Sequence, residues 1–286
     1  MNFEVLIASS IDGLTLGFVF GLMAMGLTLI FGVMKVINLG HGPFIVMGMF
    51  AVLVLSQNLG INPYVALPIV IVLGLVTGIV TYFVAVHRVI NAPELTTLLA
   101  TFSVNMMLIG ALTILFTTSP RGLSLELPSF RAGTITVLGT RVVAVLIASL
   151  VTGALYAFLY RTHTGKSIRA VANNRAAAEL MGINSSWILA LSFGIGTVLA
   201  MVAGSLLATL FGFTVLSGGG LETKSFVIVV LGGLGNPTGA LLGGIIIGLL
   251  ESITTIFMPV SYVPVFEFVV FILILLFRPN GILGAR

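Results

Sequence analysis

The sequence predicts an all-α membrane protein, a polytopic bundle of about eight transmembrane helices, and two observations support this prediction. Of its 286 residues, 58% are hydrophobic and only 7% are charged, with a mean hydropathy of +1.25, whereas roughly 25% of the residues in a soluble domain are charged. The apolar residues also form runs close to the ~20 residues that cross a bilayer. So few charges cannot cover a water-exposed surface, and we expect residues 1–286 to form one transmembrane domain.

Eight apolar segments are expected to be the spans. No basic region precedes the first segment and no small-residue cleavage site follows it, so we expect it to be retained. The second segment is short and starts beside Gly42 and Pro43, and LGGLGNPTGALLGG interrupts the seventh. Such backbone persists at membrane depth only where protein or a water-filled cavity satisfies it. Both places predict broken or re-entrant helices, either beside a translocation path or as packing kinks. The segments are 11–33, 43–57, 63–86, 95–117, 141–160, 187–212, 226–257 and 262–277.

Lysine and arginine in the short loops predict the orientation, because cytoplasmic loops are enriched in them. With the N-terminus outside, residues 226–257 enter and return as a broken hairpin and the C-terminus is cytoplasmic. The sizeable loops are then an outer one at about 118–140 and an inner one at about 161–186. The inward-facing residues are Lys35, Arg88, Arg161, Lys166, Arg169, Arg175, Arg278 and Arg286, and the outward-facing ones are Arg121, Arg131, Arg141 and Lys224.

Glycines recur at the four-residue spacing that lets helices approach closely. The pattern predicts tight helix packing, within the chain or between chains. The three sets are Gly13, Gly17 and Gly21, then Gly74 and Gly78, then Gly244 and Gly248.

Cofactor and metal motifs are incomplete. Gly165, Lys166 and Ser167 resemble the end of a phosphate-binding loop, but Tyr160 stands where the loop needs its first glycine. An ATP-driven function would therefore need a separate ATPase. The chain has no cysteine and its three histidines are scattered, so we expect no metal and no cofactor. The few basic residues show no nucleic-acid footprint, so no nucleic-acid partner is expected.

Two acids lie within or beside late apolar segments, namely Glu251 and Glu267. An ionisable group there marks a pathway, has a buried partner, or reaches to the interface from a helix end. The sequence favours none of these three interpretations.

The inner segment TGKSIRAVANNRAAAELMGINSSW predicts two short helices. Ser167 is expected to cap one that runs through Ala172, and Asn174 to cap another through Met181, with Gly182 in a left-handed conformation. Helices of this kind suit an interfacial position or a docking surface. A solvated basic loop explains the same composition equally well.

Four blocks, in the right order, resemble the shorter of the two permease types in ABC importers for branched-chain amino acids. They are GLTLIFGVMKVINLGHGPF, TGKSIRAVANNRAAAELMGI, VVLGGLGNPTGALLGG and FRPNGILG. The resemblance covers almost the whole chain. It implies a non-catalytic permease in a bacterial inner membrane that forms the path together with a second, related permease. It further implies two cytoplasmic ATP-binding subunits and a periplasmic substrate-binding protein as partners.

By this resemblance the inner loop docks on the ATPase. Pro43 stands where similar permeases commonly carry an acid, and Arg175 where they carry a proline. The first departure questions a carboxylate at the mouth of the path, and the second the start of the coupling helix. The expected coupling residues are Lys166, Arg169, Asn173, Arg175, Glu179 and Gly182, and the translocation-path candidates are Asn38, His41, Gly42, Gly235 and Asn236.

Three other functions remain open from the sequence. Relatives of this permease type also resemble parts of urea and short-amide importers, so the substrate is not fixed. An ion-coupled carrier acting alone would need a mid-membrane carboxylate with a polar partner. A membrane-embedded enzyme is least favoured, because the chain lacks a nucleophile and base set.

Overall fold

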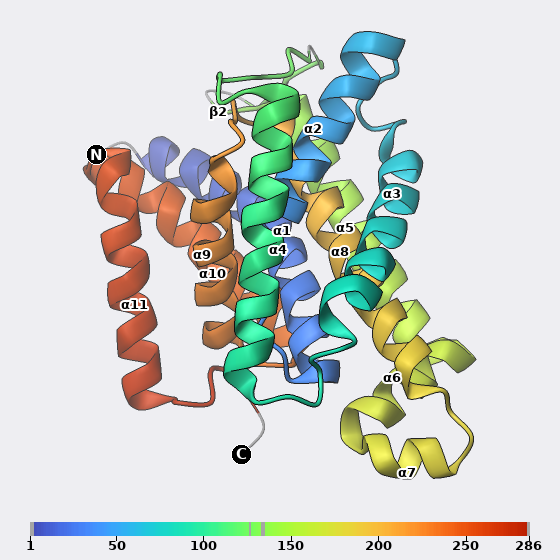
Figure 1. Cartoon of the computed structure of the whole chain (residues 1–286). Coiled ribbons are helices and arrows are strands. Elements are labelled where there is room, and N and C mark those ends of the chain that lie inside the picture. The colour runs from blue at the N-terminus through green and yellow to red at the C-terminus, as the bar shows by residue number, and fades with distance from the viewer. Residues whose placement is uncertain (1–2, 126, 133–134, 285–286) are drawn as a thin grey trace.

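The computed structural model describes residues 3–125, 127–132 and 135–284, and over these ranges the chain is mostly helical (Figure 1). Eight of the described helices are long and apolar enough to cross a membrane, as the sequence predicts. In chain order the elements are α1 (Phe3–Met34), α2 (His41–Leu59), α3 (Leu67–Thr81) with a π-helical turn (Tyr82–Val86), α4 (Glu94–Phe116), β1 (Phe130–Ala132), β2 (Ile135–Val137), α5 (Gly139–Arg161), α6 (His163–Asn173), α7 (Arg175–Leu180), α8 (Ser185–Ala208), α9 (Ser217–Gly232), α10 (Pro237–Phe257), a 3₁₀ turn (Val260–Tyr262) and α11 (Val263–Phe277).

The antiparallel helices α1 and α10 touch through their backbones. A Cβ added at Gly17 would lie 2.6 Å from the Cα of Ile245, and one at Gly21 would lie 3.1 Å from the Cα of Leu241. The helix α3 packs on α8 in the same way at Gly78. The predicted close packing is therefore confirmed, and it occurs within the chain.

The helix α2 starts inside the bundle instead of at its end. After α1 ends at Met34, residues 35–40 run back, and Nε2 of His41 lies 3.0 Å from the carbonyl oxygen of Met23. Because Met23 precedes the end of α1 by eleven residues, α2 begins about 16 Å inside that end. The discontinuity predicted at the second segment is confirmed.

The chain turns back between α9 and α10, as predicted for residues 226–257. Gly233 and Gly235 have φ values of +106° and +82°, which favour glycine. Asn236 Oδ1 accepts a hydrogen bond from the backbone N–H of Gly239 at 3.1 Å, and Pro237 occupies the first turn of α10. Pro237 and Gly239 thus lie in the first turn of α10, directly after the predicted break in the segment 226–257.

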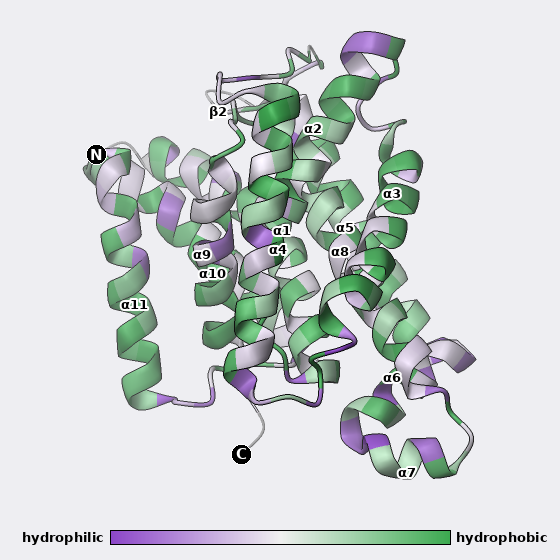
Figure 2. Ribbon diagram, in the orientation of Figure 1, coloured by the Kyte–Doolittle hydropathy of each residue, from purple (hydrophilic) through white to green (hydrophobic). Residues whose placement is uncertain are grey.

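The bundle has two distinct ends. Figure 1 shows α6, α7 and the C-terminus at one end and the β1–β2 hairpin at the other. Figure 2 shows hydrophilic residues gathered at α6 and α7 and in the turns, while apolar residues cover most of α3, α4 and α11. The exposed apolar faces of these long helices suit contact with lipid.

The inner segment forms two short helices, as predicted. Thr162, and not Ser167, caps the first: its Oγ1 accepts from the backbone N–H of Gly165 at 3.0 Å, so α6 begins at His163. Asn174 Oδ1 accepts from the N–H of Ala177 at 3.0 Å and starts α7, as predicted.

Candidate functional site

Two of the predicted path residues hold the start of α2. Asn38 Oδ1 accepts from the backbone N–H of Gly40 at 3.0 Å, and the imidazole of His41 lies against α1. Asn38 is 1% exposed and His41 is 0% exposed. In this conformation both residues are packed inside the bundle, so a role in lining the path stays a prediction.

The third path candidate, Gly42, has a partner that the sequence analysis missed. Glu222 of α9 accepts from the N–H of Gly42 at 3.2 Å and from Nδ2 of Asn105 in α4 at 3.0 Å, both through Oε2. A carboxylate at a helix start meets free N–H groups and the positive end of the helix dipole. The buried Glu222 thereby joins α2, α4 and α9.

This contact bears on the departure at Pro43, although it does not test a role at the mouth of the path. A carboxylate does lie at the start of α2, although it comes from Glu222 in another helix. This carboxylate was not predicted, because LETK resembles an outer loop and the apolar segment was expected to begin at residue 226. In the structure α9 begins nine residues earlier, at Ser217.

A second charged cluster lies on α9, α10 and α11. Lys224 Nζ lies 2.5 Å from Glu251 Oε2 and 3.0 Å from Glu267 Oε1, and it sits 4.5 Å from the ring centroid of Phe20 in α1. The prediction that Lys224 lies in an outer loop was wrong, because it belongs to α9. The two acids likewise have a buried partner, so the structure does not favour the interpretation that they only reach to the interface from helix ends.

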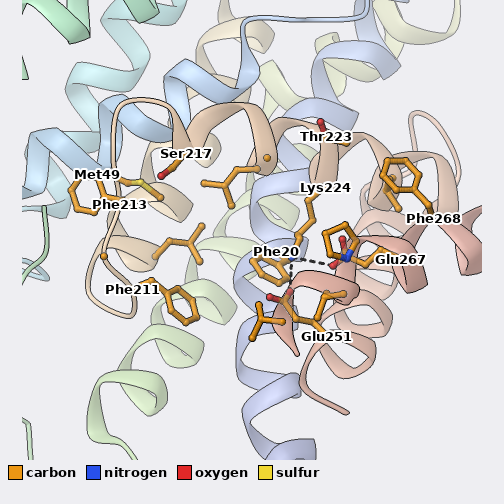
Figure 3. A pocket seen from close by; sticks show the side chains of 18 residues that line it. Phe20, Met49, Phe211, Phe213, Ser217, Thr223, Lys224, Glu251, Glu267 and Phe268 are labelled. Carbon is orange, nitrogen blue, oxygen red and sulfur yellow. Dashed lines mark hydrogen bonds and ion pairs between the residues drawn. The ribbon is translucent and has the colours of Figure 1, made fainter. Parts of the chain in front are cut away.

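These charges form one side of a cavity of about 640 Å³. Figure 3 shows Lys224, Glu251 and Glu267 gathered at one side and the apolar side chains of Met49, Phe211 and Phe213 at the other. Ligand cavities commonly measure ~300–1,000 Å³ and combine apolar walls with a few polar groups. We call this space the α9–α11 cavity.

The remaining path candidates, Gly235 and Asn236, lie at the end of the bundle that holds the C-terminus. Gly235 packs against Gly32, and a Cβ added to Gly32 would lie 3.1 Å from the Cα of Gly235. Asn236 Nδ2 donates to the carbonyl oxygen of Leu283 at 2.8 Å, which fixes the C-terminal segment to the start of α10. The structure therefore does not bring these two residues together with Asn38 and His41.

The coupling candidate Arg169 fastens α6 to α5. Its Nε donates to the carbonyl oxygen of Leu159 at 3.2 Å, and its guanidinium lies 4.6 Å from the ring centroid of Tyr160. A cation over an aromatic face contributes about 0.5–1 kcal/mol at an exposed site.

Arg175 and Glu179 tie α7 to the rest of the chain. Arg175 Nε lies 3.0 Å from Glu179 Oε1 and 3.2 Å from the Ser185 hydroxyl of α8, and its Nη1 donates to Asn91 Oδ1 at 3.2 Å. The hydrogen bond from Ser185, together with that from Arg175, holds the pKa of Glu179 below its ordinary value. The network fixes the position of α7.

This network presents two apolar side chains to the outside. Leu180 is 89% exposed and Met181 is 83% exposed, directly before Gly182, which has a φ of +81°. The other coupling candidates, Lys166 and Asn173, are exposed on α6. The turn at Gly182 therefore supports a small apolar tip.

The comparisons with known proteins agree with this architecture. The family model described as the permease component of the branched-chain amino acid transport system matches residues 9–277. The chain belongs to this permease family. The permease is 30% identical over 289 residues to BraD of Pseudomonas aeruginosa, a high-affinity branched-chain amino acid transport system permease protein; the match covers 96% of this chain and 94% of BraD.

Two further relatives give the same result. LivH of Escherichia coli K12, which carries the same description, is 29% identical over 96% of this chain and 94% of LivH. A probable branched-chain amino acid transport permease protein LivH of Methanocaldococcus jannaschii is 30% identical over 92% of this chain and 88% of that protein. No solved structure matches the permease. The family expected from the four sequence blocks is confirmed.

Proposed function

We propose that this chain is one permease domain of an ABC importer and that it forms, with a second and related permease, the path for branched-chain or other apolar amino acids. Two cytoplasmic ATP-binding subunits energise it, and a periplasmic substrate-binding protein supplies the substrate. The observation that carries this proposal is the tip at Leu180 and Met181, an apolar surface held outside the bundle by a fixed hydrogen-bond network. Such a surface suits docking to another protein.

The contacts of α6 and α7 support a route for the energy. A movement of the ATP-binding subunits would displace α6 and α7. This displacement would be transmitted to α5 through Arg169 and to α8 through the contact of Arg175 with Ser185. The helix α8 packs along α1, α2 and α3. If α8 moves as a rigid element, it would therefore displace the buried start of α2. Irregular backbone precedes this start, and a translocation path is expected beside such backbone.

The orientation follows from the same proposal. The end with α6, α7 and the C-terminus faces the bacterial cytoplasm, and the β1–β2 hairpin faces the periplasm, where a binding protein would dock. The basic residues Lys166, Arg169 and Arg175 at the first end agree with the enrichment of basic residues in cytoplasmic loops.

The apolar walls of the α9–α11 cavity favour apolar amino acids over urea and short amides as the substrate. Met49, Phe211 and Phe213 offer an apolar surface that urea has no side chain to contact. Both substrate classes remain outcomes of the experiment.

Uptake of radiolabelled leucine tests the proposal. Cells express this permease with its second permease, the ATP-binding subunits and the binding protein, and then with each partner omitted in turn. We expect uptake to require every partner and to survive an ionophore while ATP is maintained. Uptake without partners that an ionophore abolishes would instead establish an ion-coupled carrier, and uptake of urea or short amides alone would move the substrate to that class.

A further inference from the structure

The α9–α11 cavity has the composition of a binding site that recognises both ends of a ligand. Lys224, Glu251 and Glu267 come from three different helices, and Lys224 Nζ lies within 3.0 Å of a carboxylate oxygen of each acid; the three side chains are 15%, 21% and 7% exposed. Ionisable groups at membrane depth face the protein interior or a water-filled cavity, and they often mark a substrate pathway. Here the groups are buried enough for strong electrostatic contacts but remain accessible from the cavity.

The bonding capacity of this cluster is not used up by its internal ion pairs. An ammonium group has three N–H donors; that of Lys224 donates to Glu251 Oε2 and forms an ion pair with Glu267 Oε1, which accepts no hydrogen bond from the described residues. Each carboxylate has about four lone-pair sites, and Lys224 occupies one on Glu251 by a hydrogen bond, while its contact with Glu267 is an ion pair. The cluster can therefore donate to a ligand carboxylate and also accept from a ligand ammonium.

The charges of the cluster discriminate between ligand classes. Two carboxylates and one ammonium carry a net charge of −1 when all are ionised. An anionic ligand would add to this excess, whereas a zwitterion places each of its charges against a group of opposite sign. Urea and neutral amides offer no charge to either sign.

The apolar wall of the cavity indicates the chemistry of the uncharged part of the ligand. The side opposite the charges is formed by Met49, Phe211 and Phe213 (Figure 3). A ligand with a charged head and a short hydrocarbon tail therefore fits both sides, and methionine and aromatic walls adapt well to branched alkyl groups.

We propose that the α9–α11 cavity binds a zwitterionic α-amino acid with an apolar side chain during transport. The ligand ammonium lies against Glu251 and Glu267, its carboxylate accepts from Lys224, and its side chain lies toward Met49 and Phe213. This assignment rests on the proposed function for its substrate, and it names the site within the chain at which that substrate binds.

The absence of cysteine from the sequence allows a direct test. Thr223 is exposed and lines the cavity, so Thr223→Cys gives a single thiol in this chain. The complete transporter in membrane vesicles is treated with a small neutral methanethiosulfonate, and labelling of this subunit is followed with and without ligand. Leu98→Cys, in a separate cavity of about 500 Å³ formed with α1 and α9, is the control for a general change in labelling.

Three probes share one side chain and differ in charge: leucine, isoamylamine, which lacks the carboxylate, and 4-methylpentanoate, which lacks the ammonium. We expect leucine to protect Thr223→Cys at a concentration at least about tenfold lower than either analogue, since each analogue loses one charged contact with the cluster. Labelling of Leu98→Cys should not change. Equal protection by isoamylamine would overturn the zwitterion assignment, and protection by none of the probes would overturn the site.

A second variant separates a binding role from a structural one. Adding Glu267→Gln to Thr223→Cys should raise the half-protecting leucine concentration at least about tenfold. In the chain without the cysteine, Glu267→Gln should lower the leucine transported per ATP hydrolysed, while the loaded binding protein still stimulates the ATPase. An unchanged ratio together with unchanged protection would refute the assignment. If the unaltered transporter imports urea and no leucine, the proposed substrate is wrong. The labelling of Thr223→Cys still tests separately whether the cavity binds a zwitterionic amino acid.

Discussion

The contact between α2 and α8 should tolerate no side chain at Gly48. A Cβ at this position would lie 2.6 Å from the Cα of Met201, and ordinary contact begins at 3.4 Å. The added Cβ would lie nearer still to the carbonyl oxygen of Met201, so Gly48→Ala must separate the two backbones by more than about 0.8 Å or force an equivalent distortion. The carbonyl oxygen of Gly48 also accepts from the hydroxyl of Ser205 at 3.0 Å, and separation would weaken this buried hydrogen bond.

Overpacking of this kind costs about 1–3 kcal/mol. At Gly110 of α4, by contrast, an added Cβ meets nothing within 4 Å. Gly110→Ala should therefore show only the higher helix propensity of alanine, which raises the free energy of unfolding by about 0.5–1 kcal/mol. The two substitutions are chemically identical, so their difference isolates the packing of α2 on α8.

Unfolding of the purified chain by SDS titration in lipid–detergent mixtures measures the two free energies. We expect Gly48→Ala to be less stable than the parent and Gly110→Ala to be at least as stable. A Gly48→Ala protein as stable as Gly110→Ala would refute the conclusion that the backbones touch at this position.

Three further results are expected. Replacing Leu180 and Met181 together by serine should reduce co-purification of the ATP-binding subunits at least about tenfold while the melting temperature stays unchanged, and undiminished co-purification would remove the docking role of this tip. The Ser185 hydroxyl helps to lower the folded-state pKa of Glu179, so ionised Glu179 should stabilise α7 above the ordinary glutamate pKa, and this stabilisation should be lost as the pH falls through the folded-state pKa. Amide exchange in α7 should show the loss as faster exchange at low pH, and Glu179→Gln should abolish this pH dependence. Glu222→Ala should lower the free energy of unfolding more than Glu222→Gln, by about 1–3 kcal/mol, because alanine leaves two buried donors without their acceptor, and equal losses in SDS titration would contradict this.

The sequence was sufficient for the number and order of the spans. Runs of apolar residues have few alternatives in a chain with so few charges, and glycine and proline marked both discontinuities. Helix starts were less predictable. Thr162 and Ser167 are both good capping residues, and only the path of α5 into α6 decides that Thr162 meets the free N–H of Gly165. The tilt of a helix relative to its neighbours is a tertiary property that spacing along one segment does not contain.

The charged contacts could not be derived from the sequence, because each joins segments far apart in the chain. Lys224 and Glu251 are 27 positions apart, and Glu222 and Gly42 are 180 apart. The one local signal was that four residues, LETK, hold two of the chain's few charges directly before an apolar run. Because ionisable residues in a membrane segment are costly without partners, this stretch already indicated functional or paired groups. This stretch was predicted to lie in a loop, so the first nine residues of α9 were not predicted.

The same four residues connect α9 to helices on both of its sides. Glu222 and Lys224 are two positions apart, and at about 100° per residue their side chains point to nearly opposite sides of the helix. Glu222 accordingly bonds to α2 and α4, while Lys224 pairs with α10 and α11. A shift of α9 must therefore break buried charged contacts on one side unless the helices on that side move with it. Because a ligand ammonium and carboxylate in the α9–α11 cavity would add contacts on the Lys224 side alone, ligand binding would join α9 more firmly to α10 and α11 while its bonds to α2 and α4 stay as they are. In this way occupation of the cavity would change which helices α9 follows, and a bound substrate would bias the direction in which the path opens.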